Sequence, residues 1–96
     1  MTEVTASAEI RVRQSDLDFN DHVNNVHYVE WMLEALPNRG GPSEMDIVFR
    51  SAAKAGDVLS SECLCEGNRS LHQIRSVSDG AVLASAVMLW SEGVSE

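Results

Sequence analysis

The chain has 96 residues, of which 44% are hydrophobic and 23% charged, so it has the size and composition of one soluble globular domain with a single core. Its seven basic residues are scattered among fifteen acidic ones, and the net charge of −8 argues against a nucleic-acid-binding protein. No apolar run is long enough to span a bilayer and no secretory signal is visible, so we expect a cytoplasmic protein.

The chain begins with a predicted strand that leads into a polar loop. Residues 8–14 alternate strictly between apolar and polar types, with Ala8, Ile10 and Val12 on the side that faces the core. Residues 15–23 then lose this alternation and are rich in Asp and Asn. We expect a half-buried strand followed by an exposed loop.

A helix is predicted from about residue 25 to residue 36, because apolar residues recur there with helical spacing. The apolar stripe comprises Val26, Val29, Met32, Leu33 and Leu36, and the narrow polar stripe comprises His27, Glu30 and Glu34. So narrow a polar face predicts a mostly buried helix with a sheet wrapped around it. Pro37 ends the helix.

The rest of the chain has the two-residue period of β-structure. Strands are predicted over residues 45–50, 58–66, 71–77 and 81–90, with turns at residues 54–57, 67–68 and 78–80. One strand, one helix and then an antiparallel meander make an α+β domain. The expected architecture is a five-stranded antiparallel sheet around a central helix, in a single domain over residues 1–96.

Two cysteines lie two positions apart in the third predicted strand. Cys63 and Cys65 therefore share one face of that strand, where neighbouring side chains run parallel and are poorly placed for a disulfide. A lone Cys-x-Cys without a second pair of ligands is also a weak metal signal. We expect both thiols to be reduced and partly buried.

The chemistry of the chain is concentrated just before the predicted helix. Asp18, Asn20 and His22 supply a carboxylate, an amide and an imidazole at alternate positions, and together these groups suit the placing and deprotonation of a water molecule. Asn24 and Asn25 are good residues for the start of the helix. The free backbone N–H groups of a helix start can hold a developing negative charge.

The same stretch carries a family resemblance. It reads DFNDHVNNVHY from Asp18 to Tyr28, with Trp31 after it, and resembles the catalytic loop in the second hotdog domain of plant and bacterial acyl-ACP thioesterases. The likeness continues in SLHQIR at residues 70–75, in Asp79-Gly80 and in Leu89-Trp90, so that it covers roughly residues 8–91. A shorter form of the motif also marks the 4-hydroxybenzoyl-CoA thioesterase-like enzymes, which are the nearest alternative.

This resemblance implies a hotdog fold and hydrolysis of an acyl-ACP or acyl-CoA thioester in fatty acid biosynthesis, without a cofactor or metal. It implies that Asp18 is the general base or nucleophile, and that Asn20 and His22 orient the water and the thioester. Asn25 is expected to offer its backbone N–H to the thioester carbonyl. Tyr28 and Trp31 are either aromatics of the core or dimer interface, or part of an acyl-binding site.

Other polar residues of this region are expected to have structural or surface roles. Asp16 and Asp21 are interpreted as solvated loop carboxylates, and His27 and His72 as structural or surface histidines. Both carriers are negatively charged, so either would need a local basic patch on this acidic protein. The residues available for such a patch are Arg11, Arg13, Arg39, Arg50, Lys54, Arg69 and Arg75.

The chain departs from the acyl-ACP thioesterase pattern at one place. Those enzymes have a Glu, followed in the plant members by a Cys, where this chain has Ala52 and Ala53. Either Asp18 works alone, as in the 4-hydroxybenzoyl-CoA type, or the domain is a non-catalytic module that binds acyl chains or serves assembly. Because relatives in this family carry two hotdog domains, we also expect a homodimer, or a dimer of dimers, joined through sheet edges.

Overall fold

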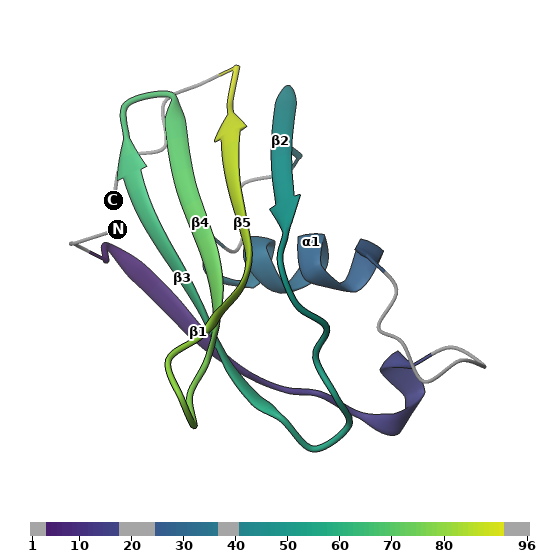
Figure 1. The fold of residues 1–96 in the computed structure, drawn as a ribbon. Coiled ribbons are helices and arrows are strands. Elements are labelled where there is room, and N and C mark those ends of the chain that lie inside the picture. The colour runs from purple at the N-terminus through teal and green to yellow at the C-terminus, as the bar shows by residue number, and fades with distance from the viewer. Residues whose placement is uncertain (1–3, 18–24, 37–40, 92–96) are drawn as a thin grey trace.

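The structure, a computed structural model, describes residues 4–17, 25–36 and 41–91. In this part of the chain, five strands form one antiparallel sheet, and a helix lies across one of its faces (Figure 1). The elements are β1 (Ala6–Arg11), the short 3₁₀ helix η1 (Gln14–Asp16), α1 (Asn25–Glu34), β2 (Glu44–Phe49), β3 (Val58–Glu66), β4 (Arg69–Ser76) and β5 (Val82–Leu89). The predicted α+β class is confirmed.

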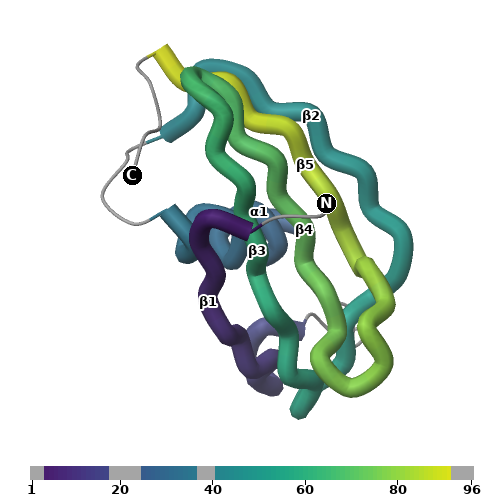
Figure 2. The backbone as a smooth tube through the Cα atoms, turned by 90° about the vertical axis from the view of Figure 1, so that its left-hand side faces the viewer, coloured from purple at the N-terminus to yellow at the C-terminus, as the bar shows by residue number. Residues whose placement is uncertain are grey.

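The order of the strands in the sheet is β1-β3-β4-β5-β2. The predicted meander therefore holds for β3, β4 and β5, but it is wrong for β2, which pairs with β5 at the far edge rather than with β3. The chain leaves β2 at Phe49 and crosses the lower end of the sheet to begin β3 at Val58, as the side view in Figure 2 shows. Both edge strands, β1 and β2, thus come from the part of the chain before the meander.

The hairpin between β3 and β4 forms where the sequence predicts it. Gly67 has φ of 62°, a left-handed conformation that glycine adopts without the steric cost of a Cβ. The turn sets Glu66 opposite Arg69, and from there the register runs to Leu59 opposite Ser76. This register places Leu59, Ser61 and Cys63 on the face of the sheet that is turned towards α1, called the inner face below.

The core lies between the inner face and α1. Met32 of the helix and Leu59, Ile74 and Met88 of the sheet are fully buried. The helical stripe is confirmed for Met32 but wrong at its start, because Val26 is 62% exposed in the first turn of α1. The core cluster also contains Val12, Tyr28, Trp31, Ala35, Leu36, Ala53, Cys63, Leu83, Ala84, Ala86 and Trp90. None of the described helices is long and apolar enough to cross a membrane.

A polar network is buried between β4, the end of β5 and the helix. Trp90 Nε1–H donates to Ser70 Oγ at 2.9 Å, and Ser70 Oγ lies 2.6 Å from His72 Nε2. The hydroxyl of Ser70 thus lies between the indole N–H and the imidazole, and it donates to His72 Nε2 or accepts from it according to the imidazole tautomer. His72 is 1% exposed, and its Nδ1 lies by the backbone carbonyl of Met32 without a hydrogen bond of good geometry.

The cysteines lie as predicted on one face of β3. Cys63 is buried and Cys65 half-buried, with their sulfur atoms 3.7 Å apart. Cys63 Sγ also lies 3.9 Å from His72 Nε2. The two thiols therefore pack as small apolar side chains at the margin of the buried network.

We predict that His72 makes folding stability depend on pH in the mildly acidic range. Burial lowers its pKa to about 4, an effect that the carbonyl of Met32 partly opposes. The unfolded chain binds the proton with a pKa of about 6.5, so stability is complete above that pH and is lost as the pH falls towards 4, by at most about 3 kcal/mol.

Chemical denaturation at a series of pH values measures this loss. His72→Gln keeps an acceptor for Ser70 but cannot titrate, so its free energy of unfolding should change less than that of the wild type between these pH values. Parallel pH profiles for the two proteins would contradict the assignment to His72.

Candidate functional site

The three central residues of the predicted site lie in a segment outside the described part of the chain. Asp18, Asn20 and His22 all fall there, as does Asp21. The structure does describe both flanks of this segment: η1 and Leu17 precede it, and α1 follows it. The described residues of the candidate site are therefore those of these two flanks.

The helix begins where the motif predicts. Asn25 is the first residue of α1 and is exposed. The first turn of α1 contains no acidic residue that would neutralise the partial positive charge of the helix start. The first backbone N–H groups of this helix are the kind of donor that stabilises an oxyanion.

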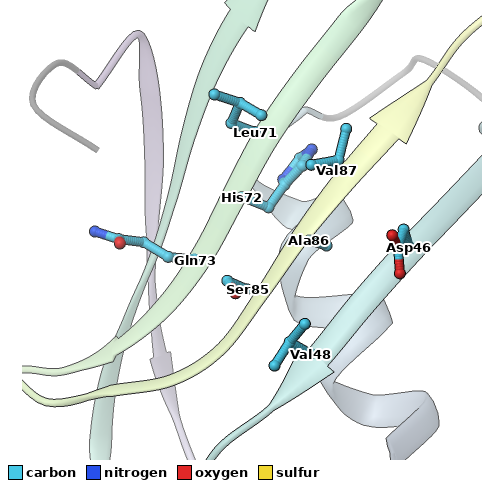
Figure 3. A pocket seen from close by; sticks show the side chains of 8 residues that line it. All are labelled: Asp46, Val48, Leu71, His72, Gln73, Ser85, Ala86 and Val87. Carbon is cyan, nitrogen blue, oxygen red and sulfur yellow. The ribbon is translucent and has the colours of Figure 1, made fainter.

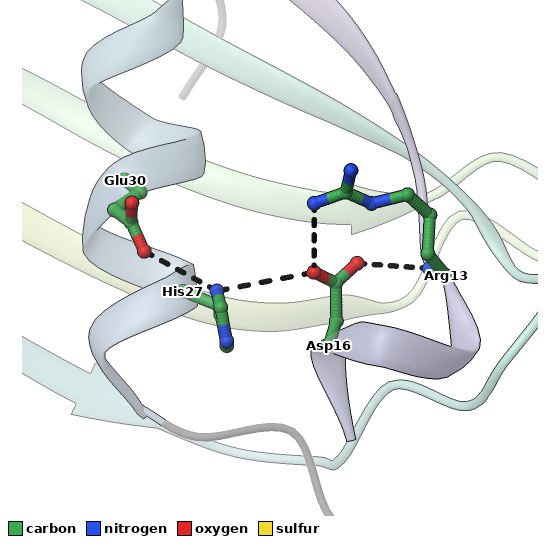
Figure 4. A network of polar contacts seen from close by, with 4 residues as sticks. All are labelled: Arg13, Asp16, His27 and Glu30. Atoms are coloured by element: carbon green, nitrogen blue, oxygen red, sulfur yellow. Dashed lines mark hydrogen bonds and ion pairs between the residues drawn. The ribbon is translucent and has the colours of Figure 1, made fainter.

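Asp16 is not the solvated loop carboxylate that the sequence suggested. It is only 3% exposed, and it lies at the end of η1 facing the first turn of α1 (Figure 4). Its Oδ2 accepts the backbone N–H of Arg13 at 2.8 Å, and its Oδ1 accepts from the Arg13 guanidinium at 3.2 Å. The expectation was wrong because solvation was inferred from loop composition, whereas the carboxylate turns inward and closes the turn itself.

The carboxylate of Asp16 stays ionised in this position. Burial acts to raise its pKa, but the hydrogen bonds from the backbone and side chain of Arg13, with the charges of Arg13 and His27, outweigh burial and lower the pKa below its ordinary value. A buried carboxylate is tolerated only when it is paired and hydrogen-bonded. Arg13 and His27 supply these partners from opposite sides.

His27 connects the two flanks of the motif. Its Nδ1 lies 3.9 Å from Asp16 Oδ1 and 3.2 Å from Glu30 Oε1, so the imidazole stands between two carboxylates. The ring is stacked on Trp31 with ring centroids 6.1 Å apart. The interpretation of His27 as a structural or surface residue is thus refined to a half-buried contact between α1 and η1.

Tyr28 and Trp31 are buried in the core, on the side of α1 that faces the sheet. The ring of Tyr28 meets Trp31 edge-on at 5.3 Å and Phe49 edge-on at 5.6 Å. Tyr28 Oη accepts the backbone N–H of Ala53 at 2.9 Å. This position matches the core alternative for both aromatics, and their contact with an acyl chain stays a prediction.

The two alanines that the sequence analysis matches to the family's Glu and Cys lie in the segment that leaves β2. Ala52 is exposed and Ala53 is buried against Tyr28. Ala53, the residue expected at the position of the family's Cys, thus contributes a methyl group to the core. Neither side chain offers a group for proton transfer.

A shallow groove runs across the other face of the sheet, over β4, β5 and β2. Figure 3 labels its eight lining residues, including Leu71, Val87 and Val48. This groove is separated by the sheet from α1 and from both flanks of the motif, so it is not part of the candidate active site. Within the residues that the structure describes, no group of His, Cys, Asp and Glu side chains is placed to hold a metal ion.

Comparison with known proteins identifies the family. The profile of the acyl-ACP thioesterase C-terminal domain matches residues 1–92. The chain belongs to this family. The match includes the motif from Asp18 to Tyr28 and both of its flanks.

Relatives and solved structures agree with this assignment. The chloroplastic dodecanoyl-[acyl-carrier-protein] hydrolase of Cinnamomum camphora is 34% identical over 87 residues, which cover 88% of this chain and 21% of that protein. The 12:0-ACP thioesterase from Umbellularia californica superposes with a TM-score of 0.85 at 24% identity, over 95% of this chain and 36% of that chain. A thioesterase from Thermus thermophilus, complexed with coenzyme A and Zn, superposes with a TM-score of 0.76 at 19% identity, over 100% of this chain and 90% of that chain.

These comparisons confirm the predicted hotdog fold for this acyl-ACP thioesterase domain. They also show that the chain spans about a fifth of the length of the curated relatives it matches. The residue that sequence reasoning missed is Asp16. The local sequence offers only the turn that Asp16 closes, through the N–H of Arg13 three residues earlier, and gives no sign of the carboxylate's burial.

We predict that Tyr28→Phe destabilises this acyl-ACP thioesterase domain by about 1–3 kcal/mol, because it leaves the N–H of Ala53 buried without an acceptor. The ring and its contacts with Trp31 and Phe49 are retained in this variant. Urea denaturation measures the change in the free energy of unfolding. Equal stability of variant and wild type would show that the hydrogen bond contributes nothing to the fold.

Proposed function

We propose that the chain is a thioester hydrolase that cleaves acyl-ACP or acyl-CoA to a free acid and a thiol, with Asp18 as general base or nucleophile. The observation that carries this proposal is the family match over residues 1–92, which contains the whole motif at the start of α1. Membership of a thioesterase family supports thioester hydrolysis. The roles of Asp18, Asn20 and His22 come from the motif.

In the proposed reaction, Asp18 takes a proton from a water molecule whose oxygen attacks the thioester carbonyl. Asn20 and His22 orient the water and the thioester. The negative charge on the carbonyl oxygen is held by N–H groups at the start of α1, Asn25 among them. When the tetrahedral intermediate collapses, the C–S bond breaks and the thiolate takes up the proton from Asp18, so the base is regenerated.

The carrier is proposed to approach the end of the sheet that bears η1. Arg11 ends β1 there, Arg13 precedes η1, and Arg50 and Lys54 follow β2. Backbone hydrogen bonds place these segments at one end of the sheet, with Gly56 bonded to Val12 and Arg50 bonded to Leu83. This grouping is a local source of positive charge on an otherwise acidic protein, as a phosphorylated or acidic carrier requires.

The domain is proposed to pair with another hotdog domain through β2, as a homodimer or within a dimer of dimers. β2 is an edge strand, and its Met45, Val48 and Phe49 are exposed apolar side chains. An exposed apolar edge strand offers unpaired backbone groups to a second strand. A second copy of this chain would supply the other half that relatives carry in the same polypeptide.

A second candidate function follows from Ala52 and Ala53. With no carboxylate or thiol at these positions, the domain would bind acyl chains, or serve assembly, without turnover. The single-domain organisation over residues 1–96, the role in fatty acid biosynthesis and the cytoplasmic location stay predictions with either function.

We predict that the wild type releases free thiol from at least one donor in a panel of acyl-CoA and acyl-ACP thioesters, and that Asp18→Asn lowers kcat by ~100-fold or more because the general base is lost. Cys63 and Cys65 must be titrated first, since their thiols would otherwise be counted as product.

Asp79→Asn is the matched control, because it removes an exposed carboxylate that accepts the N–H of Ala81 in the β4–β5 turn. It should keep wild-type turnover. Acyl-chain binding without release of thiol, in a folded wild type, would favour the binding module.

We also predict that Val48→Asp weakens self-association, raising the Kd of the dimer by ~10-fold or more, because it places a charge on the β2 edge. Val77→Asp is the control, since Val77 has a similar exposure of 48% against 51% for Val48 but lies beyond β4. Analytical ultracentrifugation measures both variants. Dimers of equal affinity in Val48→Asp and Val77→Asp would exclude the β2 edge as the interface.

A further inference from the structure

Asp16 makes more contacts than the closing of a turn requires. The chain contains the same turn a second time, where the backbone N–H of Lys54 donates to Asp57 Oδ2 at 2.8 Å, the distance also found between Arg13 N and Asp16 Oδ2. Asp57 does this while partly exposed to solvent. Burial of the carboxylate is therefore not needed for the turn.

The burial of Asp16 arises from its second set of contacts. Its Oδ1 lies 3.2 Å from the Arg13 guanidinium and 3.9 Å from His27 Nδ1, and His27 belongs to α1. Removing a carboxylate from water costs free energy that only paired, hydrogen-bonded groups return. At Asp16 this arrangement joins two elements that are separated by residues 17–24.

The position of His27 is itself fixed by its surroundings. Stacking on Trp31 and the contact of Nδ1 with Glu30 Oε1 at 3.2 Å hold the ring from within α1. Trp31 is in turn buried in the core. The link from Asp16 to the helix therefore continues, through His27, to a side chain that is buried in the core.

We propose that Asp16 is a positioning residue for the hydrolysis reaction: through His27 it fixes η1 against the first turn of α1, and so sets the two ends of the segment that carries Asp18. This inference rests on the proposed thioesterase function. Asp18 follows Asp16 by two residues, and the proposed oxyanion donors belong to the same turn of α1 as His27. A general base and the oxyanion donors must keep a fixed position relative to each other, because small misplacements lower the reaction rate by large factors.

Asp16→Asn tests the proposal. The amide keeps the shape of the side chain and an oxygen for the N–H of Arg13, but it loses the charge that draws the guanidinium and His27. We expect kcat to fall by ~10-fold or more and KM to change less than kcat, because Arg13 of the proposed carrier patch keeps its own charge when its partner is neutralised. Asp57→Asn, which changes the equivalent carboxylate of the second turn, should leave kcat unchanged.

Stability and dynamics separate positioning from a general loss of structure. Both variants should unfold cooperatively in urea, and hydrogen exchange should rise in Asp16→Asn at the amides of His27 and its neighbours in the first turn of α1, but not in β3 and β4. Unchanged kcat in Asp16→Asn, or a fall of equal size in Asp57→Asn, would overturn the proposal.

A double-mutant cycle with His27→Gln tests whether Asp16 acts through the helix. If it does, the losses in kcat of Asp16→Asn and His27→Gln are not additive, and the double variant is about as slow as the slower single variant. Additive losses would overturn the route through His27.

The hydrogen-exchange arm does not need turnover. If the wild type releases no thiol, the proposed function fails. Faster exchange at the first turn of α1 in Asp16→Asn would then still support the proposal that Asp16 fixes η1 against α1. Exchange equal to that of the wild type would overturn it.

Discussion

The structure depends on one helix covering the inner face of a five-stranded sheet. The ten residues of α1 bury Met32 and the aromatic pair against that face, and polar contacts attach the helix along its length. The first turn meets Asp16 through His27, Tyr28 accepts the N–H of Ala53 from the segment after β2, and the carbonyl of Met32 lies by His72 of β4. Each attachment comes from a different part of the chain, so the helix organises the whole domain.

Local sequence patterns predicted the elements well. The bounds of β3 and the start of α1 agree with expectation because alternation, glycine turns and helix-start residues are local signals. The place of β2 was missed, since strand order depends on which edges meet in three dimensions. The same holds for Val26, whose apolar side chain fits the helical stripe but is exposed in the first turn of α1.

The candidate site also has a part that local sequence patterns predict and a part that depends on contacts between distant segments. The motif from Asp18 to Tyr28 is readable from sequence because its residue types are unusual at that spacing, and it identifies the family. The role of Asp16 is not readable, because an Asp in a polar loop has the same local signature whether it faces solvent or a histidine from another element. Burial by a distant segment is the information that the sequence alone lacked. Through its contacts with Arg13 and His27, Asp16 joins the two flanks of the motif, although the sequence suggested only a solvated loop carboxylate.

The strand order also bears on how the chain reaches its fold. The pairings within β3, β4 and β5 join neighbours in sequence and need only short loops to close, whereas Ala6 must find Cys63 and Glu44 must find Leu89. Long loops cost more entropy to close, so we expect the central hairpins to assemble first and both edges to dock afterwards. Since β1 leads directly into η1, we expect η1 and its contact with α1 to form among the last parts of the described structure.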